Sequence, residues 1–312
     1  MFGKMKEWKE KGYFVNPWTL VKGAFGVFPL MAAMLRHPSM LTGLFRSGGE
    51  SRDDPEPIEM PYEIPQYKEG MSHCNSKERY LRPTYFCESD APEIIALANE
   101  LGAFQKSDRE YAEAAFQWVQ HNVRPGLIMS GALGTLKSGK AVCVDRTSLF
   151  IALCRAGGIP AKYRIAREVV TEQFIDGFAQ DPMTRMLMEA MGGTDIISVA
   201  ETKIGDEWVR SYLNLPEWAA LTGVPISHLG EDSVDFYSYR PHEAKVMEGL
   251  PVVVGMGKIL FRLMGRKRIN RMNAQFDERY RKGKKILDEI GLEEYDRRIR
   301  ESYHFIMPRI SL

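Results

Sequence analysis

The spacing of apolar residues predicts three helices in the middle of the chain. The first opens at Asp90, a favourable N-cap, with Pro92 in its first turn. The second begins with the capping-box pattern Ser107-Asp-Arg-Glu110. The third covers residues 145–156 and ends at the glycine pair that follows. This part of the chain is therefore expected to be predominantly helical.

Apolar runs farther along the chain predict three strands, at residues 161–165, 196–204 and 207–213. The last two are expected to form a hairpin that turns at Gly205-Asp206. A helical insertion over about residues 173–191 is expected between the first strand and the hairpin. Helices followed by a small antiparallel sheet indicate the α+β class.

Composition changes along the chain divide it into four parts. Glycine, proline and acidic residues concentrate in one stretch, which is typical of a linker, and charged residues dominate the end of the chain in one long helical pattern, from about Arg266 to Tyr303. The parts are a hydrophobic and basic helical arm at 1–45, a linker at 46–66, a core at 67–240 and a C-terminal helical extension at 241–312.

Two apolar segments flank the core, at residues 23–35 and 250–264, and both adjoin clusters of Lys and Arg. They have 13 and 15 residues, and a membrane-spanning helix needs about 20. We expect helices over residues 14–45 and 250–264 whose apolar faces pack together or on the core. They would leave a contiguous apolar patch edged by basic side chains, namely Lys22, Lys258, Arg262 and Arg266. That patch would suit a protein partner or an anionic membrane surface.

The charge and cysteine counts exclude several classes of protein. Lys and Arg number 42 and Asp and Glu number 41, so no overall positive charge indicates nucleic-acid binding. Four cysteines in 312 residues are too few for a disulfide scaffold and favour a reducing, cytoplasmic location. Cys74 and Cys87 could pair, or join His73 on zinc, but no second Cys-x-x-C arm follows, so no metal or cofactor is expected.

Cys143 is the candidate nucleophile. It follows the flexible approach Gly139-Lys-Ala-Val and stands where a helix begins, and a helix N-terminus stabilises a thiolate. Its backbone N–H would help to form an oxyanion site. Cys154 lies among apolar residues in the middle of the same helix and is expected to be a buried structural thiol. The alternative for Cys143 is a small apolar residue that fills the start of the helix.

The segment Gly139-Lys-Ala-Val-Cys143-Val-Asp145, with Arg155-Ala-Gly-Gly-Ile-Pro160-Ala after it, resembles the nucleophile helix of the transglutaminase-like superfamily. Upstream, Tyr80-Leu-Arg-Pro-Thr84 and Phe116-Gln-Trp118-Val119 also resemble bacterial members. The resemblance implies a papain-like core, in which the nucleophile helix packs on a small antiparallel sheet. It also implies a Cys-His-Asp triad that attacks amide or ester carbonyls.

The family His and Asp are missing from their expected positions. In the family a Trp follows a Glu by seven residues, and Glu201 and Trp208 have the same spacing. This alignment puts Ile197 at the position of the family His and Tyr212 at the position of the family Asp. Three interpretations stay open. Another histidine could supply the base, Cys143 could react without a strong base by thioester exchange, or the fold could be a binding module with an inactive cysteine. The candidate histidines are His121, His228, His242 and His304.

Other residues around the nucleophile are candidates for the site. Tyr212 would donate a hydrogen bond to a bound carbonyl, and Asp145 would act in catalysis or as a first-turn acid that favours the helix dipole. Trp208 is expected behind the site in the core and, with Glu201 and Arg146, at the substrate. The sequence thus predicts an atypical cysteine enzyme for acyl transfer or amide or thioester chemistry on a small or acylated substrate. The alternative is a catalytically degenerate module that binds a partner or membrane.

Overall fold

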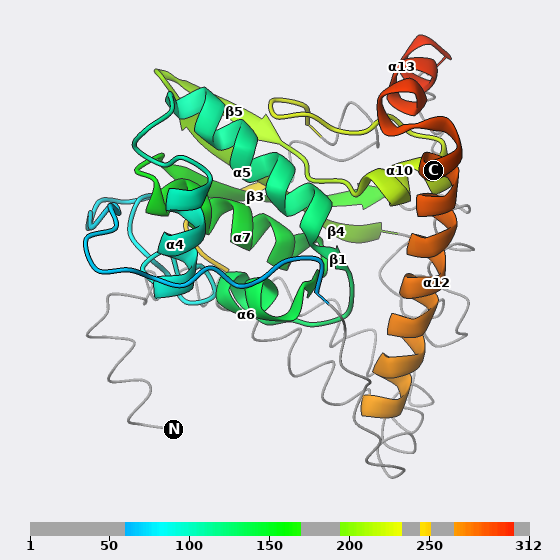
Figure 1. Cartoon of the computed structure of the whole chain (residues 1–312), viewed down its shortest axis with the longest axis horizontal. Helices are drawn as coiled ribbons and strands as arrows, with labels where there is room; N and C mark the ends of the chain where they lie inside the picture. Colours follow the sequence, from blue (N-terminus) through cyan, green and yellow to red (C-terminus); the bar gives the residue numbers. More distant parts are fainter. Residues whose placement is uncertain (1–59, 170–193, 233–243, 251–264, 303–312) are drawn as a thin grey trace.

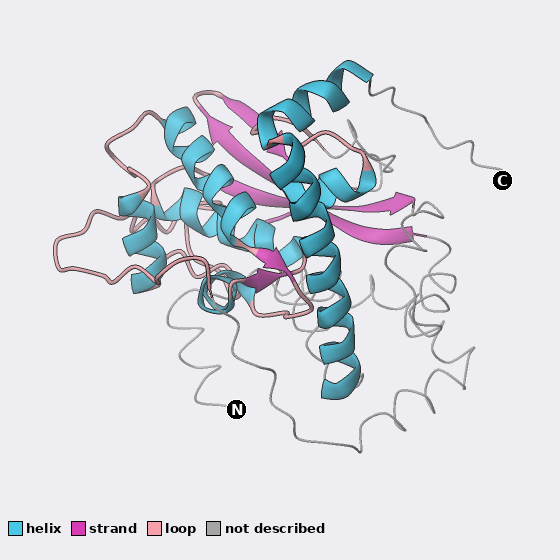
Figure 2. Ribbon diagram, turned by 45° about the vertical axis from the view of Figure 1, so that its right-hand side comes forward, coloured by secondary structure: helices cyan, strands magenta, loops and turns pink. Residues whose placement is uncertain are grey.

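A computed structural model describes residues 60–169, 194–232, 244–250 and 265–302 of the chain (Figure 1). Its main sheet is antiparallel, with the strand order β5-β4-β3-β6, and in Figure 2 the helices stand in front of it. The predicted α+β class is confirmed. The strands are β3 Ala161–Val169, β4 Thr194–Ile204, β5 Glu207–Ser211 and β6 Lys245–Met247.

Helix α7, Cys143–Ala156, is the buried centre of the fold. It packs against β3 and β4 on one side and against three other helices on the others. Every residue of α7 after Cys143 is buried. The predicted packing of this helix on a small antiparallel sheet is therefore confirmed. The neighbouring helices are α4 Pro92–Glu100, α5 Asp108–Asn122 and α6 Gly131–Ser138.

The ends of the helices follow local sequence signals in part. Ser107 and Glu110 form the predicted capping box at the start of α5. Asp90 is not the N-cap of α4, because the chain turns helical one residue later and Ala91 takes that place. Helix α6 and the short parallel pair β1 (Arg124–Pro125) and β2 (Lys140–Ala141) were not predicted.

Strands β3 and β4 are longer than the apolar runs predicted, and β5 is shorter. Pairing of β3 with β4 extends to Val169 and Thr194, and β5 ends at Ser211, before Tyr212. The hairpin does turn at Gly205, whose φ of 61° suits a residue without a side chain. The expected helical insertion at 173–191 lies outside the described residues.

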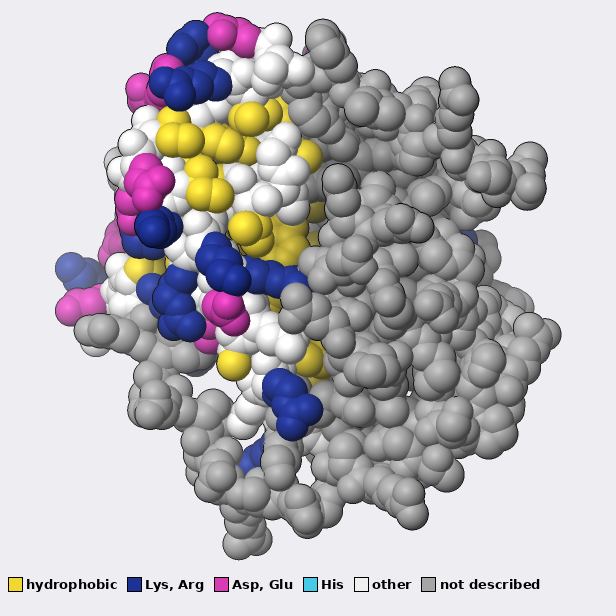
Figure 3. All heavy atoms as spheres, turned by 90° about the vertical axis from the view of Figure 1, so that its right-hand side faces the viewer, with side chains coloured by type: hydrophobic (Ala, Val, Ile, Leu, Met, Phe, Trp, Pro, Cys, Tyr) yellow, Lys and Arg dark blue, Asp and Glu magenta, His cyan; other side chains and the backbone are white. Residues whose placement is uncertain are grey.

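The C-terminal pattern folds as two helices, α12 Arg266–Ile290 and α13 Leu292–Ser302, and the prediction of one helix is wrong. Gly291 separates them with a φ of 87°, which a continuing helix does not allow. Helix α12 runs along the side of the molecule and crosses α10, Pro216–Thr222 (Figure 1). Basic and acidic side chains intersperse on the described surface of this side of the molecule (Figure 3).

Several predicted features fall outside the described residues. The apolar arm at 23–35 and most of 250–264 are among them, so their packing and any partner or membrane contact stay predictions. At the end of the predicted linker, Tyr62 packs edge-on against Trp118, with 4.8 Å between the ring centroids, and donates a hydrogen bond to the Leu136 carbonyl. Within the described residues, no helix is long and apolar enough to cross a membrane.

The crossing of α10 and α12 gives a test of the fold. A Cβ atom at Gly283 would lie 1.8 Å from the Glu217 carbonyl oxygen, which is backbone and cannot move aside cheaply. We expect Gly283→Ala to lower the free energy of unfolding in urea by about 1–3 kcal/mol, through overpacking. The exposed Lys285→Ala is the control and should be nearly neutral. An exposed helical glycine would instead gain about 1 kcal/mol on the same change, and that gain would contradict the packing.

Candidate functional site

Cys143 is the first residue of α7, and its side chain is partly exposed. Its N-cap, Val142, has extended backbone and no capping side chain, so the N–H groups of the first turn are not capped from there. Gly139 turns the chain from α6 into β2 with a φ of 64°, just before the nucleophile. The local sequence thus presents a thiol at an uncapped helix N-terminus, which favours an anion.

Asp145 lies in the first turn of α7, and its carboxylate points away from solvent. Its two oxygens accept hydrogen bonds from the backbone N–H of Ser130, at 3.1 Å, and of Gly131, at 3.0 Å. Asp145 is fully buried and holds the loop that opens α6.

Arg146 is buried at the same end of α7, with 6% of its surface exposed. Its Nη1 donates a hydrogen bond of 3.1 Å to the Leu213 carbonyl. Burial lowers the pKa of Arg146, while the charges of Cys143, Tyr212 and Glu217 act in the opposite direction. The structure therefore groups Cys143, Arg146 and Tyr212, three residues that the sequence predicted for the site.

The residue at the family His position lies in a small apolar cluster. Ile197 pairs with Ala166 across β3 and β4, and both pack with Tyr212 and Ala244. Helix α7 meets β4 beside it, where the Thr147 hydroxyl donates to the Ser198 carbonyl at 3.3 Å. Because side chains alternate along a strand, Ile197 points to the face opposite Ser198. No proton transfer can pass through an isoleucine side chain at this position.

Two of the candidate histidines are described. His121 lies on α5 with Nδ1 2.7 Å from the Gln117 carbonyl of the same helix. His228 places Nε2 3.1 Å from the Asp296 carboxylate, and its side chain is largely exposed. These contacts engage each ring in local structure. His242 and His304 lie outside the described residues, so whether they replace the family His stays open.

Glu201 and Trp208 are part of a charged surface of the sheet. The Glu201 carboxylate accepts from Arg164, from Lys162 at 3.1 Å and from Arg210 at 3.3 Å. Burial raises the pKa of Glu201, but Arg164 and Lys162 outweigh this and hold the pKa below its ordinary value. Trp208 is 37% exposed with Lys162 over its ring, so its predicted place in the core is wrong. Trp208 lies on β5, the edge strand of the sheet, where the described residues leave it partly uncovered.

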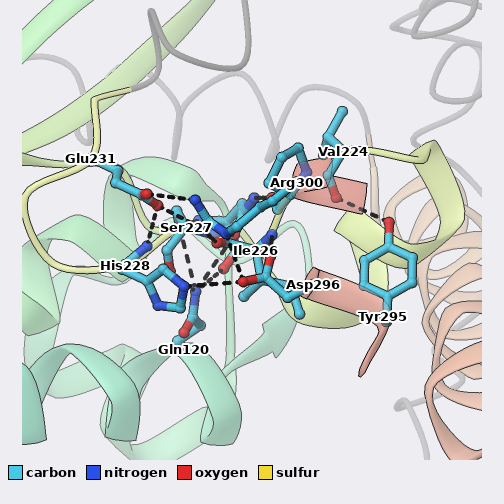
Figure 4. A network of polar contacts seen from close by, with 11 residues as sticks. Gln120, Val224, Ile226, Ser227, His228, Glu231, Tyr295, Asp296 and Arg300 are labelled. Carbon is cyan, nitrogen blue, oxygen red and sulfur yellow. Dashed lines mark hydrogen bonds and ion pairs between the residues drawn. The ribbon is translucent and has the colours of Figure 1, made fainter. Parts of the chain in front are cut away.

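A buried polar network fixes the segment that follows β5 (Figure 4). The Gln120 amide donates to the carbonyl oxygens of Asn214, at 3.1 Å, and Ser227, at 2.9 Å. The Ser227 hydroxyl donates to the Tyr212 carbonyl at 2.5 Å. This network was not predicted from the sequence, although a Gln on the apolar face of a helix is a detectable signal.

Helix α13 braces the same segment from outside (Figure 4). The Asp296 carboxylate accepts from the Ile226 backbone N–H at 2.8 Å, and Arg300 contacts both Asp296 and Glu231. The Glu231 carbonyl in turn accepts from the Tyr212 backbone N–H at 2.8 Å. The C-terminal extension therefore contributes directly to the position of Tyr212.

Comparison with known proteins supports the resemblance found in the sequence. Residues 95–213 match the model of the Transglutaminase-like superfamily. Among solved structures, the crystal structure of a "Putative Cysteine Protease" from Cytophaga hutchinsonii matches with 24% identity and a TM-score of 0.32. That match covers 54% of this chain and 50% of the other, so it spans half of that protein's length. No curated protein matches the chain.

The lowered pKa of Glu201 predicts how its contribution to stability depends on pH. A carboxylate whose pKa is depressed on folding stabilises the fold above its unfolded pKa, and loses that effect as pH falls through its folded pKa. We expect Glu201→Gln to cost about 1–3 kcal/mol at neutral pH, by leaving cations unpaired, and less in acid. Urea unfolding at several pH values measures this. The exposed Glu207→Gln is the control, and an equal cost for Glu201→Gln at every pH would contradict the ion pairs.

Proposed function

We propose that this chain, whose residues 95–213 match the model of the transglutaminase-like superfamily, is a cysteine enzyme that transfers acyl groups through Cys143. Its donor would be an activated acyl thioester, and its substrate a small or acylated molecule. The observation that carries the proposal is the partly exposed Cys143 at the uncapped N-terminus of α7, with the Arg146 guanidinium beside it. Both features favour a thiolate.

The reaction would run by thiol–thioester exchange. The Cys143 thiolate attacks the carbonyl carbon of the donor, a new carbon–sulfur bond forms, and the donor's carbon–sulfur bond breaks with release of its thiolate. An amine, thiol or water then attacks the acylated Cys143 and restores the thiol. The carbonyl oxygen carries the negative charge in each tetrahedral step, and the backbone N–H of Cys143 and its first-turn neighbours would stabilise it.

The apolar position of Ile197 favours a thioester over an amide as the donor. An amide nitrogen must be protonated before it leaves, which the family His does as a general acid. A thiolate leaves without a proton, because a thiol is a much stronger acid than the neutral amine that an amide would release. The two candidate histidines that the structure describes, His121 and His228, are engaged elsewhere. Thioester exchange therefore makes the least demand on the residues that this site provides.

A second candidate function is a binding module with an inactive cysteine. Its support is the structural use of residues around the nucleophile, since Asp145 holds a loop and Ile197 fills an apolar cluster. Such a module would keep the fold and the helix without using the thiol. The two candidates differ in one observable, the formation of an acyl–Cys143 intermediate.

Intact-protein mass spectrometry tests the proposal. We expect incubation with the N-acetylcysteamine thioesters of acetate and octanoate to add one acyl group, located on Cys143 by peptide mapping. The adduct should persist in Cys74→Ser and vanish in Cys143→Ser. Cys74 is the matched control, as the other partly exposed thiol. Burial raises the pKa of both remaining thiols, Cys87 and Cys154, and makes them unreactive.

The opposite result would favour the binding module. Acylation of Cys74 and Cys143 at the same slow rate, matching that of a free cysteine, would show that the fold does not activate its nucleophile. Acylation of a matched amide donor as fast as the thioester would instead show a general acid at the site.

A further inference from the structure

Arg146 is buried without a full set of hydrogen-bond acceptors. A guanidinium has five N–H donors and stays protonated in proteins, so burial without compensation is costly. Its Nη1 bonds to the Leu213 carbonyl, and its Nε makes no hydrogen bond among the described residues. A neutral carbonyl compensates only part of a buried charge. The position therefore calls for a nearby negative charge.

Three groups that can be negative act on the charge of this guanidinium, and they are Cys143, Tyr212 and Glu217. Cys143 and Arg146 are three residues apart on α7, a spacing that puts two side chains on the same helix face. Tyr212 is a phenol, and phenols ordinarily carry no charge at physiological pH. The choice of counter-charge thus lies between the Cys143 thiolate and the Glu217 carboxylate.

Glu217 is also used by another contact. It lies in the first turn of α10, and its charge and hydrogen bond help to raise the pKa of Tyr280 to about 12, after the larger effect of burial. Its carboxylate is therefore shared between a phenol and the field of Arg146. The thiolate is the counter-charge that lies on Arg146's own helix.

We propose that Arg146 holds Cys143 as a thiolate, and so supplies the positive charge that the imidazolium supplies in a Cys-His pair. Arg146 is a positioning residue in this account, since it acts on the nucleophile and not on the substrate. The segment that binds it is rigid, because Gln120 and Ser227 fix the backbone on both sides of Leu213. A guanidinium cannot pass a proton to a leaving group, which agrees with a donor that needs none.

The inference rests on the proposed role of Cys143 as the nucleophile, but its test needs no acyl donor. The test follows iodoacetamide alkylation of Cys143 against pH, by peptide mass spectrometry, in the full chain. Cys74 serves as the reference thiol within each sample. For the unmodified chain we expect a midpoint for Cys143 below about 8.5, the ordinary value of a free thiol.

Three variants test whether the charge of Arg146 lowers the alkylation midpoint of Cys143. Arg146→Gln should raise the midpoint for Cys143 by about one to two units, which is the usual effect of one close opposite charge. At a pH below both midpoints, the thiolate fraction and with it the alkylation rate should fall by about tenfold to a hundredfold. Arg146→Lys should keep at least half of the depression. Glu217→Gln should lower the midpoint further, because it removes the competing negative charge.

The outcomes decide the proposal in either direction. A midpoint for Cys143 that is unchanged in Arg146→Gln, or raised equally in Arg146→Lys, would overturn it. If circular dichroism shows that neither Arg146 variant folds, Glu217→Gln decides: a lower midpoint supports the proposal, and an unchanged or higher one overturns it. A depressed midpoint in a chain that fails to acquire an acyl group would contradict the proposed function alone.

Discussion

The position of α7 is the constraint on which the rest of the structure depends, and buried arginines fix both of its ends. At its carboxyl end, the fully buried Arg155 donates to the carbonyl oxygens of Arg82, Ala161 and Glu248, at 2.6 to 3.0 Å. At its amino end, Arg146 donates to the Leu213 carbonyl. The contacts with Arg82, Glu248 and Leu213 join α7 to distant segments, so a shift of the helix would leave buried guanidinium groups without their hydrogen-bond acceptors.

The described part of the chain has the fold of a cysteine enzyme, but an apolar residue takes the position of the group that would transfer protons. The helix, its first turn without a side-chain cap from Val142, and the antiparallel sheet are present, and they place a partly exposed thiol at the start of the helix. The position of the family base holds Ile197 in an apolar cluster. A site of this kind suits reactions in which the leaving group departs unprotonated. The C-terminal helices belong to the same unit, because α13 braces the segment that carries Tyr212.

The sequence predicted the fold well where local signals and tertiary packing agree. The Ser107 capping box, the Gly205 hairpin and the helix after Cys143 are strong local patterns, and all are present. Predictions were wrong or missing where a long-range contact determines the position of a side chain. The place of Trp208 depends on which strand lies at the edge of the sheet, and the partners of Arg146 come from a segment about 70 residues away. No local pattern carries that information.

The central claim is that Cys143 ionises near neutral pH without the family's His and Asp. Ultraviolet absorbance of the thiolate tests it directly, as a pH titration of the full chain minus that of Cys143→Ser. The account predicts a single ionisation in this difference, with a midpoint well below that of an ordinary thiol at about 8.5. A midpoint at or above that value would contradict it, and Cys143 would then be a structural thiol at the start of a helix.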